Sequence, residues 1–346
     1  MKRPTQADVA RIAGVSMATV SYVINDRADD RVSISAETRL RVMKAVEKIG
    51  YVPNSRARSL RSGDTKIIGL VIPDIRNPHF WDNVDGVEQE LRTSGYHLLL
   101  SSLGQQNEFG DQIYKDLTGQ RIDGLILMGT YIDQFRDAQD SLIKLIKRRL
   151  PIVELSDYVR RGHNVDQVVS DYRNATNEVM SHLLSLGHRR IGMIYGVAMP
   201  DLALDRLQPY QQSLHDAGLP VDRNLVVNTG PAIEDGYRAA LQVLNLPSRP
   251  TAVIAINDLL AIGAIRAAAD LGLQIPADLS LVGYDDIFPT NYLVPRLSTV
   301  SKDAVRMGRE AVRLVLERIR NPDLPRRVIE ISARFIIRES IGPAPS

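Results

Sequence analysis

Residues 5–26 read TQADVARIAGVSMATVSYVIND, and this stretch decides the fold of the N-terminal part of the chain. Thr5 and Asp8 have the spacing of a capping box, which predicts the start of a short helix. Gly14 favours a left-handed backbone that ends this helix, and Ser16 can cap a second helix over residues 17–24. The first helix is expected to bury an apolar face made of Val9, Ala10, Ile12 and Ala13. The stretch therefore predicts two short helices joined by a tight turn.

The second predicted helix divides into two faces. Val20, Val23 and Ile24 are expected to pack inward, which leaves Met17, Ala18, Ser21 and Tyr22 facing outward. This division is typical of a helix-turn-helix, whose second helix lies in the DNA major groove and offers residues near its N-terminus to base edges. An ordinary helical hairpin is the alternative on spacing alone, because caps and a glycine turn occur in many proteins.

The segment DVARIAGVSMATVSYVIND resembles the opening of lactose/galactose-repressor (LacI-type) bacterial regulators, whose signature is D-V-A-x-x-A-G-V-S-x-x-T-V-S-x-V-x-N. Nearly every signature position is matched. The resemblance implies that the DNA-binding residues of this module are Thr5, Ser16, Met17, Ala18, Thr19, Ser21, Tyr22 and Asn25. Tyr22 stands where Arg or His is more usual. Since Arg is the common reader of guanine, the operator is expected to differ from the commonest family consensus.

A third helix is predicted from Ser35 to about Ile49, with Leu40, Met43, Val46 and Ile49 on one face and Gly50 at its end. The following PNSRARSL resembles the family's hinge, P-N-x-x-A-R-x-L, which folds into a helix on operator DNA and enters the minor groove. By that resemblance Asn54 begins the hinge helix, Arg58 lies near phosphates and Leu60 is the apolar wedge between base steps. The alternative is that Leu60 packs on its own domain.

Composition and charge favour two kinds of partner. The chain has 346 residues, 44% of them hydrophobic, as expected for a globular protein of two or three domains. The first 63 residues hold 12 Lys and Arg against 6 Asp and Glu, a net charge of +6, whereas the remainder carries −4. This split favours nucleic acid as the partner of the first segment and a different partner for the rest.

The cellular compartment is also suggested by composition. The absence of cysteine excludes a disulfide framework and thiolate metal sites. No apolar run approaches the roughly 18 residues of a membrane helix, and the N-terminus lacks the apolar core of a secretory signal. A cytoplasmic protein is therefore expected.

From Lys66 onward, short apolar strands alternate with helical stretches, which is the pattern of βαβ units and parallel sheets. The first series of strands is predicted at residues 67–72, 97–100, 124–128 and 152–155, and the second at 191–195, 225–227, 252–256 and 279–282. Two lobes of about a hundred residues each fit normal domain size. The resemblance extends here and implies the fold of the periplasmic sugar-binding proteins.

The expected architecture is thus an all-α helix-turn-helix DNA-binding domain followed by an α/β two-lobed, periplasmic-binding-protein-like sensor domain with parallel doubly wound sheets. The domains are placed at residues 1–53, at 54–64 for the hinge and linker, and at 65–342 for ligand binding and dimerisation. The first lobe is expected at about 65–168 and 297–325, with a strand at 298–300 and a helix at 304–320. The second is expected at about 169–296 and 326–342, with a strand at 334–337. The chain would then cross between lobes near Val168, Arg296 and Pro325.

Ligands of doubly wound sheets bind at the C-terminal ends of strands, so polar residues at these positions are candidates for an effector site. Asp74 follows the first strand, and the nearby NPHF resembles the family's N-P-F-F, which implies ligand contacts by Asn77, His79 and Phe80. RLQPY resembles R-L-x-G-F, so Arg206 is expected to make a fork-like contact, and Asn257 and Asp285 are contacts by the same resemblance. The alternative is that Asn and Asp cap the next helix and that Phe80 fills the lobe interior.

Some positions depart from the family. Ser156 and Asp157, Pro200, Pro231 and Lys302 stand where relatives often show other contacts, and Lys302 replaces a usual Gln. A Lys there could favour an anionic ligand or could turn to solvent. No HExxH, GxGxxG, P-loop or GxSxG is present and the six His residues are scattered, so no catalytic residue, metal site or cofactor is expected.

The sequence therefore predicts a ligand-responsive transcription repressor. It would bind a pseudo-palindromic operator in double-stranded DNA and respond to a small effector, a sugar or sugar derivative, between its lobes. A C-terminal leucine heptad is absent, which favours a homodimer over a tetramer. The alternative function is that of a solute-binding protein, which would leave the first 63 residues unexplained.

Overall fold

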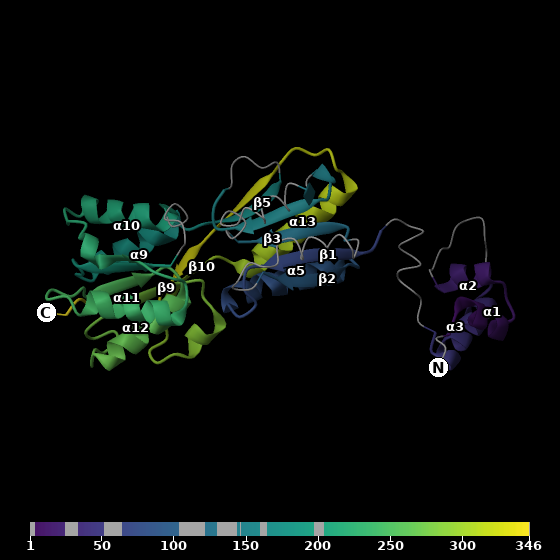
Figure 1. The fold of residues 1–346 in the computed structure, drawn as a ribbon, viewed down its shortest axis with the longest axis horizontal. Coiled ribbons are helices and arrows are strands. Elements are labelled where there is room, and N and C mark those ends of the chain that lie inside the picture. The colour runs from purple at the N-terminus through teal and green to yellow at the C-terminus, as the bar shows by residue number, and fades with distance from the viewer. Residues whose placement is uncertain are drawn as a thin grey trace. The chain divides into compact units, whose positions relative to one another are not determined.

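The computed structural model describes residues 4–24, 34–51, 64–103, 122–129, 144–145, 147–159, 165–196 and 204–345. The chain divides into two compact units, Met1–Thr65 and Lys66–Ser346, and many of their helices and strands are labelled in Figure 1. Among the predicted DNA-binding residues, Asn25, Asn54, Arg58 and Leu60 lie outside the described ranges.

The first unit contains the helices α1 (Gln6–Ala13), α2 (Met17–Ile24) and α3 (Ala36–Ile49). Thr5 begins α1 in a capping box, because its backbone N–H donates to Asp8 Oδ2 at 3.0 Å while its side chain accepts from the Asp8 backbone. Gly14 ends α1 with a φ of 65°, and Ser16 Oγ accepts from the Thr19 backbone at 3.1 Å at the start of α2. The predicted order of helix, turn and helix is confirmed.

The core of this unit differs in part from the predicted faces. It is formed by Val9, Ala10, Ala13, Val20, Val23, Val42 and Ala45. Ile12 was expected inside but is 42% exposed, and Leu40 and Met43 of α3 are 56% and 50% exposed. Residues spaced by three do not stay on one face of a helix with 3.6 residues per turn. Leu40 and Met43 therefore lie away from the face that buries Val42 and Ala45.

The first lobe of the second unit is built on a parallel sheet of order β11-β5-β4-β3-β1-β2. Its strands are β1 (Ile67–Ile72), β2 (His97–Ser102), β3 (Gly124–Met128), β4 (Ile152–Ser156), β5 (Asp166–Asp171) and β11 (Val328–Ser332). The helices α5 (Trp81–Thr93) and α13 (Ala304–Arg320) pack against one face, and η1 (Pro78–Phe80) precedes α5. Val87 and Leu91 of α5 and Val312 and Val315 of α13 are buried in the shared core.

The second lobe has a sheet of order β12-β10-β9-β8-β6-β7, parallel except for the antiparallel pair of β10 and β12. Its strands are β6 (Ile191–Tyr195), β7 (Val226–Asn228), β8 (Ala252–Ala255), β9 (Ser280–Tyr284), β10 (Ser298–Ser301) and β12 (Arg334–Ile336). Figure 1 shows α9 (Arg173–Ser185) and α10 (Leu204–Asp216) on one face, and α11 (Ile233–Leu244) and α12 (Asp258–Asp270) on the other. The short helices η3 (Arg223–Leu225) and η4 (Phe288–Tyr292) complete the lobe.

Two predicted lobe assignments are wrong. β10 was placed in the first lobe, but it pairs with β9 in the second sheet, with Thr299 opposite Gly283, so the chain crosses at Lys302 rather than near Arg296. β11 pairs with β5 in the first sheet, so the last crossing falls at Ala333 rather than near Pro325. The physical reason is that a short apolar run fits either sheet, because hydrophobic pattern specifies a strand but not its partner.

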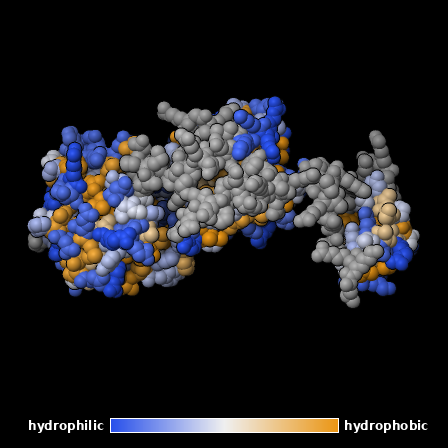
Figure 2. Space-filling view, in the orientation of Figure 1, coloured by the Kyte–Doolittle hydropathy of each residue, from blue (hydrophilic) through white to orange (hydrophobic). Residues whose placement is uncertain are grey.

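The described helices are too short to span a membrane singly. Within the described ranges no single helix is long and apolar enough to cross a bilayer, and α1 and α2 reach that length only as a pair bent by 103°. Figure 2 shows hydrophilic side chains interspersed with smaller apolar areas over the visible described atoms around α9–α12.

Candidate functional site: the recognition helix and the cavity of the sensor unit

The helix α2 offers an uncharged surface to its surroundings. Ser16, Met17 and Ala18 at its start are exposed, and Thr19, Ser21 and Tyr22 are half-buried. Ser16 Oγ and Thr19 Oγ1 lie 2.9 Å apart, which holds the first turn of α2 in place. Of the charged residues that the structure describes, Arg11 of α1 is the nearest in sequence to α2, and its guanidinium lies 2.7 Å from Asp8 Oδ1. Met17, Ala18, Thr19, Ser21 and Tyr22, which are predicted to contact DNA, therefore lie on one short helix whose N-terminal end is the more exposed.

Arg206 lies almost fully buried on α10, with 4% of its side chain exposed. Its guanidinium carbon is 3.7 Å from the ring centroid of Tyr172, in a stacked cation–π contact. Arg206 Nη1 donates to Asp205 Oδ1 at 3.0 Å, and Nη2 donates to Asp157 Oδ2 at 3.3 Å. The Nε donor of Arg206 and the Oδ2 acceptor of Asp205 have no hydrogen-bond partner. A buried guanidinium with one nitrogen that has no hydrogen-bond partner suits a ligand that presents oxygen atoms.

Asp157 follows β4 and links the two cations of the site. Lys302 Nζ lies 3.5 Å from Asp157 Oδ1, opposite the contact of Arg206 with Oδ2. Burial alone would raise the pKa of the Asp157 carboxyl, but the charges of Lys302 and Arg206 outweigh it and hold this pKa well below its ordinary value. Burial raises the pKa of Asp205, in spite of the neighbouring Arg206 charge.

His79 and Asp285 join the two lobes directly. His79 belongs to η1 of the first lobe and Asp285 follows β9 of the second, and His79 Nδ1 lies 2.8 Å from Asp285 Oδ1. Asp285 and Asp286 have φ values of 106° and 57°, which side-chain-bearing residues rarely adopt. The strained turn aims the Asp285 carboxylate at the opposite lobe.

Asp258 supports this turn from the first residue of α12. It is fully buried; its Oδ2 accepts from the Ile287 backbone at 2.9 Å and its Oδ1 accepts from Thr299 Oγ1 at 2.7 Å. Burial, with a further contribution from the Asp285 charge, raises the pKa of Asp258. Gly283 leaves room for this carboxylate, because a Cβ there would lie 2.1 Å from Asp258 Oδ1.

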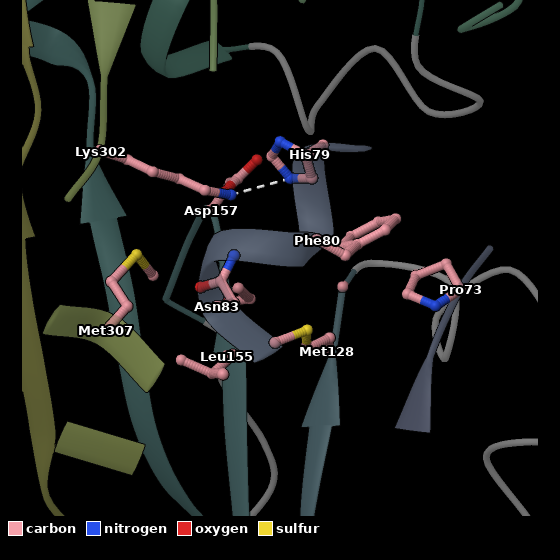
Figure 3. Close-up of a pocket in the computed structure, with 11 residues that line it drawn as sticks. Pro73, His79, Phe80, Asn83, Met128, Leu155, Asp157, Lys302 and Met307 are labelled. Carbon is pink, nitrogen blue, oxygen red and sulfur yellow. Dashed lines mark hydrogen bonds and ion pairs between the residues drawn. The ribbon is translucent and has the colours of Figure 1, made fainter. Parts of the chain in front are cut away.

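A cavity of about 80 Å³ lies beside these groups. It is lined by Pro73, His79, Phe80, Asn83, Met128, Gly129, Leu155, Ser156, Asp157, Lys302 and Met307. In Figure 3 Lys302 and His79 point toward one another, and Met128, Leu155 and Met307 lie below them. Lys302 has only 5% of its side chain exposed, so the expectation that it could turn to solvent is wrong.

The remaining predicted effector residues make local contacts. Asp74 accepts from Arg76 Nη2 at 3.0 Å, and Asn77 caps η1 by accepting from the His79 backbone at 3.0 Å. Asn257 caps α12 by accepting from the Leu260 backbone at 2.7 Å. His79, Arg206 and Asp285 therefore belong to one connected network, Phe80 lines the cavity, and Asp74, Asn77 and Asn257 hold strand ends and helix starts.

Sequence reasoning left two members of the network without a role. Asp157 was noted only as a departure from the family, and Tyr172 was not considered, whereas Lys302 was expected either to favour an anionic ligand or to turn to solvent. Asp157 does carry a usable signal, because it follows a predicted strand just as Asp74 and Asp285 do. No motif or spacing in the sequence pointed to Tyr172. Among the described residues, no group of three or more His, Cys, Asp or Glu could hold a metal ion.

A helix-turn-helix unit joined to a two-lobed α/β unit with a polar cavity defines the class of ligand-responsive DNA-binding regulators. Comparison with known proteins identifies the family. Residues 5–54 match the bacterial regulatory proteins of the lacI family, and residues 180–341 match a periplasmic binding protein-like domain. The ribose operon repressor of Haemophilus influenzae is 34% identical over 337 residues, which cover 97% of this chain and 98% of that protein. The chain belongs to the lacI family of bacterial regulatory proteins.

Solved structures of similar proteins agree with the fold. The lac repressor dimer bound to operator and the anti-inducer ONPF gives a TM-score of 0.82 at 26% identity, covering 98% of this chain and 99% of that one. The complex of the transcriptional regulator CelR with cellobiose gives 0.71 at 29% identity, covering 98% and 100%. The protein is thus a DNA-binding transcriptional regulator, and the alternative of a solute-binding protein finds no support.

Proposed function

We propose that this protein is a repressor that binds a pseudo-palindromic operator as a homodimer, in the cytoplasm, and responds to a small sugar-like effector. The observation that carries the proposal is the combination in one chain of a helix-turn-helix unit with a polar cavity beside contacts between lobes, His79 with Asp285 and Arg206 with Asp157. The polar groups that would bind an effector are the groups that hold the lobes together. A ligand bound there changes how firmly the lobes are joined.

On the DNA side, α2 enters the major groove. The base and phosphate contacts come from Thr5, Ser16, Met17, Ala18, Thr19, Ser21, Tyr22 and Asn25, and the hinge contributes Asn54, Arg58 and Leu60. An uncharged recognition helix leaves phosphate binding to basic residues elsewhere in the first 63, which carry a net charge of +6. Homodimerisation is supported by the lac repressor, whose operator complex is a dimer.

On the effector side, Arg206 and Asp285 are the polar anchors and His79 and Phe80 supply ring surfaces. Asp74, Asn77 and Asn257 complete the set of proposed contacts from the ends of strands. Sugars are bound by apolar or aromatic surfaces together with a few polar groups that satisfy several hydroxyls, and the cavity has both. The similarity to a ribose operon repressor and to the CelR–cellobiose complex supports a sugar or sugar derivative.

Regulation follows from the difference in effector affinity between two arrangements of the lobes. Coupling between two such sites typically amounts to about 1–3 kcal/mol, or roughly 5- to 150-fold in operator affinity. No chemical step is required, so the protein acts without enzymatic turnover and without a cofactor.

The proposal is tested by selecting operator fragments. The purified protein is incubated with a genomic fragment library at moderate salt, and the recovered site is bound again in the presence of a panel of sugars and sugar acids. Recovery of one palindromic site whose occupancy changes with one compound supports the proposal. Tight sugar binding with no recovered site at any salt concentration would contradict it.

A further inference from the structure

Lys302 occupies an unusual place for a lysine. It lies at the crossing between β10 of the second lobe and α13 of the first, and of the lysines in the described ranges it alone is buried. The next residue, Asp303, has a φ of 53°, so the crossing holds a conformation that non-glycine residues rarely adopt. Burial of an ammonium group is costly unless it is paired, and Lys302 reaches both Asp157 and His79.

The contact with His79 fixes the position of a proton. Lys302 Nζ lies 2.8 Å from His79 Nε2, the contact drawn in Figure 3. An ammonium group has three donors and no acceptor, so Nε2 must accept and carries no proton. The imidazole is then neutral with its proton on Nδ1, which lies 2.8 Å from Asp285 Oδ1 but makes no hydrogen bond in this arrangement. Lys302, His79 and Asp285 form one line of contacts from a cation to a carboxylate.

Further charged and aromatic groups surround His79 and Lys302. Asp157 lies 3.5 Å from Lys302 Nζ, and the charge of Asp82, an exposed residue of α5, interacts with that of Lys302. The ring of Phe80 stands edge-on to His79 with centroids 4.8 Å apart. Carboxylates thus surround the Lys302 charge, which leaves no uncompensated positive charge here to attract an anion.

We propose that Lys302 is a specificity-determining positioning residue that acts through His79. It holds His79 in the Nδ1–H tautomer, which occupies Nε2 and places the Nδ1–H donor beside the Asp285 carboxylate without a hydrogen-bond partner of its own. Two of the three Lys302 donors have partners, so one N–H remains to meet a ligand oxygen. The cavity therefore selects an uncharged, hydroxyl-bearing effector and discriminates against sugar acids and sugar phosphates. This selectivity rests on the proposed function, whereas the tautomer does not.

The tautomer is tested on the full-length protein labelled with ¹⁵N-histidine. Nitrogen spectra near pH 7.5 distinguish the two neutral tautomers and the imidazolium, and His79→Gln assigns the signal among the six histidines. We expect Nδ1 protonated and Nε2 unprotonated in the wild type. Lys302→Gln should keep the Nε2 signal near its wild-type position because an amide N–H also donates, and Lys302→Met should shift it. A protonated Nε2 in the wild type, or an unchanged signal in Lys302→Met, would overturn the assignment.

The selectivity is tested by calorimetry with four probes: D-ribose, cellobiose, D-ribonate and ribose 5-phosphate. We expect an uncharged probe to bind at least about tenfold more tightly than the anionic ones, Lys302→Met to weaken it roughly tenfold or more, and Lys302→Gln to stay within about threefold. Lys147→Met, the same change at an exposed lysine of this unit, is the matched control. Preference for an anionic probe that Lys302→Gln abolishes would make Lys302 an anion receptor and overturn the proposal. If no probe binds while the tautomer is as expected, the sugar effector is wrong and the positioning role stands.

Discussion

Arg206 of the second lobe and Asp157 of the first meet at 3.3 Å between Nη2 and Oδ2, although they lie 49 positions apart in the chain. Arg206 also stacks on Tyr172 and binds its own neighbour Asp205. One buried cation thus serves two carboxylates on different lobes. Its removal leaves Asp205 without its cationic partner and leaves Asp157 with Lys302 alone as a cationic partner.

We predict that Arg206→Ala lowers the free energy of unfolding by about 3–5 kcal/mol, because breaking a buried pair on one side strands the other charge. Chemical denaturation near pH 7 measures the loss. Arg92 of α5 provides the matched control, since its pair with Glu88 is exposed and Arg92→Ala should cost less than about 1 kcal/mol. Equal losses in the two variants would contradict a structural role for the Arg206 network.

We predict that the stability of the protein depends on Asp157 at acid pH. Lys302 and Arg206 outweigh the effect of burial and hold the pKa of Asp157 below its value in the unfolded chain. The unfolded state therefore binds the proton more tightly, and the stabilisation is present above about pH 4 and lost as the pH falls below it. Asp157→Asn should flatten the dependence of the unfolding free energy on pH between about 2 and 4. Glu178→Gln, which removes one exposed carboxyl, controls for the loss of a charge.

We predict that Gly283→Ala destabilises the second lobe by about 1–3 kcal/mol, because the added Cβ would lie 2.1 Å from Asp258 Oδ1 and overpack the site. Asp258→Ala removes the acceptor of the Ile287 N–H and the Thr299 hydroxyl, at about 1–3 kcal/mol for each donor left unsatisfied. Asp258→Asn keeps one acceptor oxygen, so its stability should lie between that of the wild type and that of Asp258→Ala. Thermal unfolding checks the order, and a neutral Asp258→Ala would show that the turn at Asp285 does not need this support.

We predict different effects for two hinge residues assigned from the sequence, both outside the described ranges. Arg58→Ala should weaken operator binding and reduce the slope of log affinity against log salt by about 1, because one phosphate contact is lost. Leu60→Ala should weaken specific binding while leaving that slope unchanged, because it removes an apolar wedge. Fluorescence anisotropy at several salt concentrations separates them. If Leu60→Ala left the operator affinity unchanged, the proposal that Leu60 of the hinge contacts DNA would be wrong.

Sequence predicted the elements well where periodicity was strong. The helix 304–320 and the strands 124–128 and 191–195 have the predicted bounds, because each combines a continuous apolar pattern with clear end signals. The strands β5 and β11 were not predicted. β5 reads DQVVSD and β11 reads VIEIS, with polar residues that interrupt short apolar runs. β5 and β11 form strands because they pair with each other in the folded lobe, although more than a hundred residues separate them in the sequence.

The sequence identified individual residues of the candidate site but not the contacts between them. Arg206, His79 and Asp285 were found from motifs, but their connection through Asp157 and Lys302 depends on where the chain crosses between lobes. That crossing was placed near Arg296 instead of Lys302, so the meeting of Lys302 with His79, 223 positions away, could not be foreseen. Local sequence carries the chemistry of each side chain, and tertiary packing decides which of them meet.

The most direct test of the coupling between cavity and DNA is operator binding measured with and without the effector, in the wild type and in Arg206→Lys. This variant keeps a positive charge near Asp157 but loses the planar fork and the stacking on Tyr172. We predict that the effector changes operator affinity roughly 5- to 150-fold in the wild type, and that Arg206→Lys binds the operator normally while responding only at much higher effector concentration. An identical effector response in both proteins would contradict the claim that this cavity controls the DNA-binding unit.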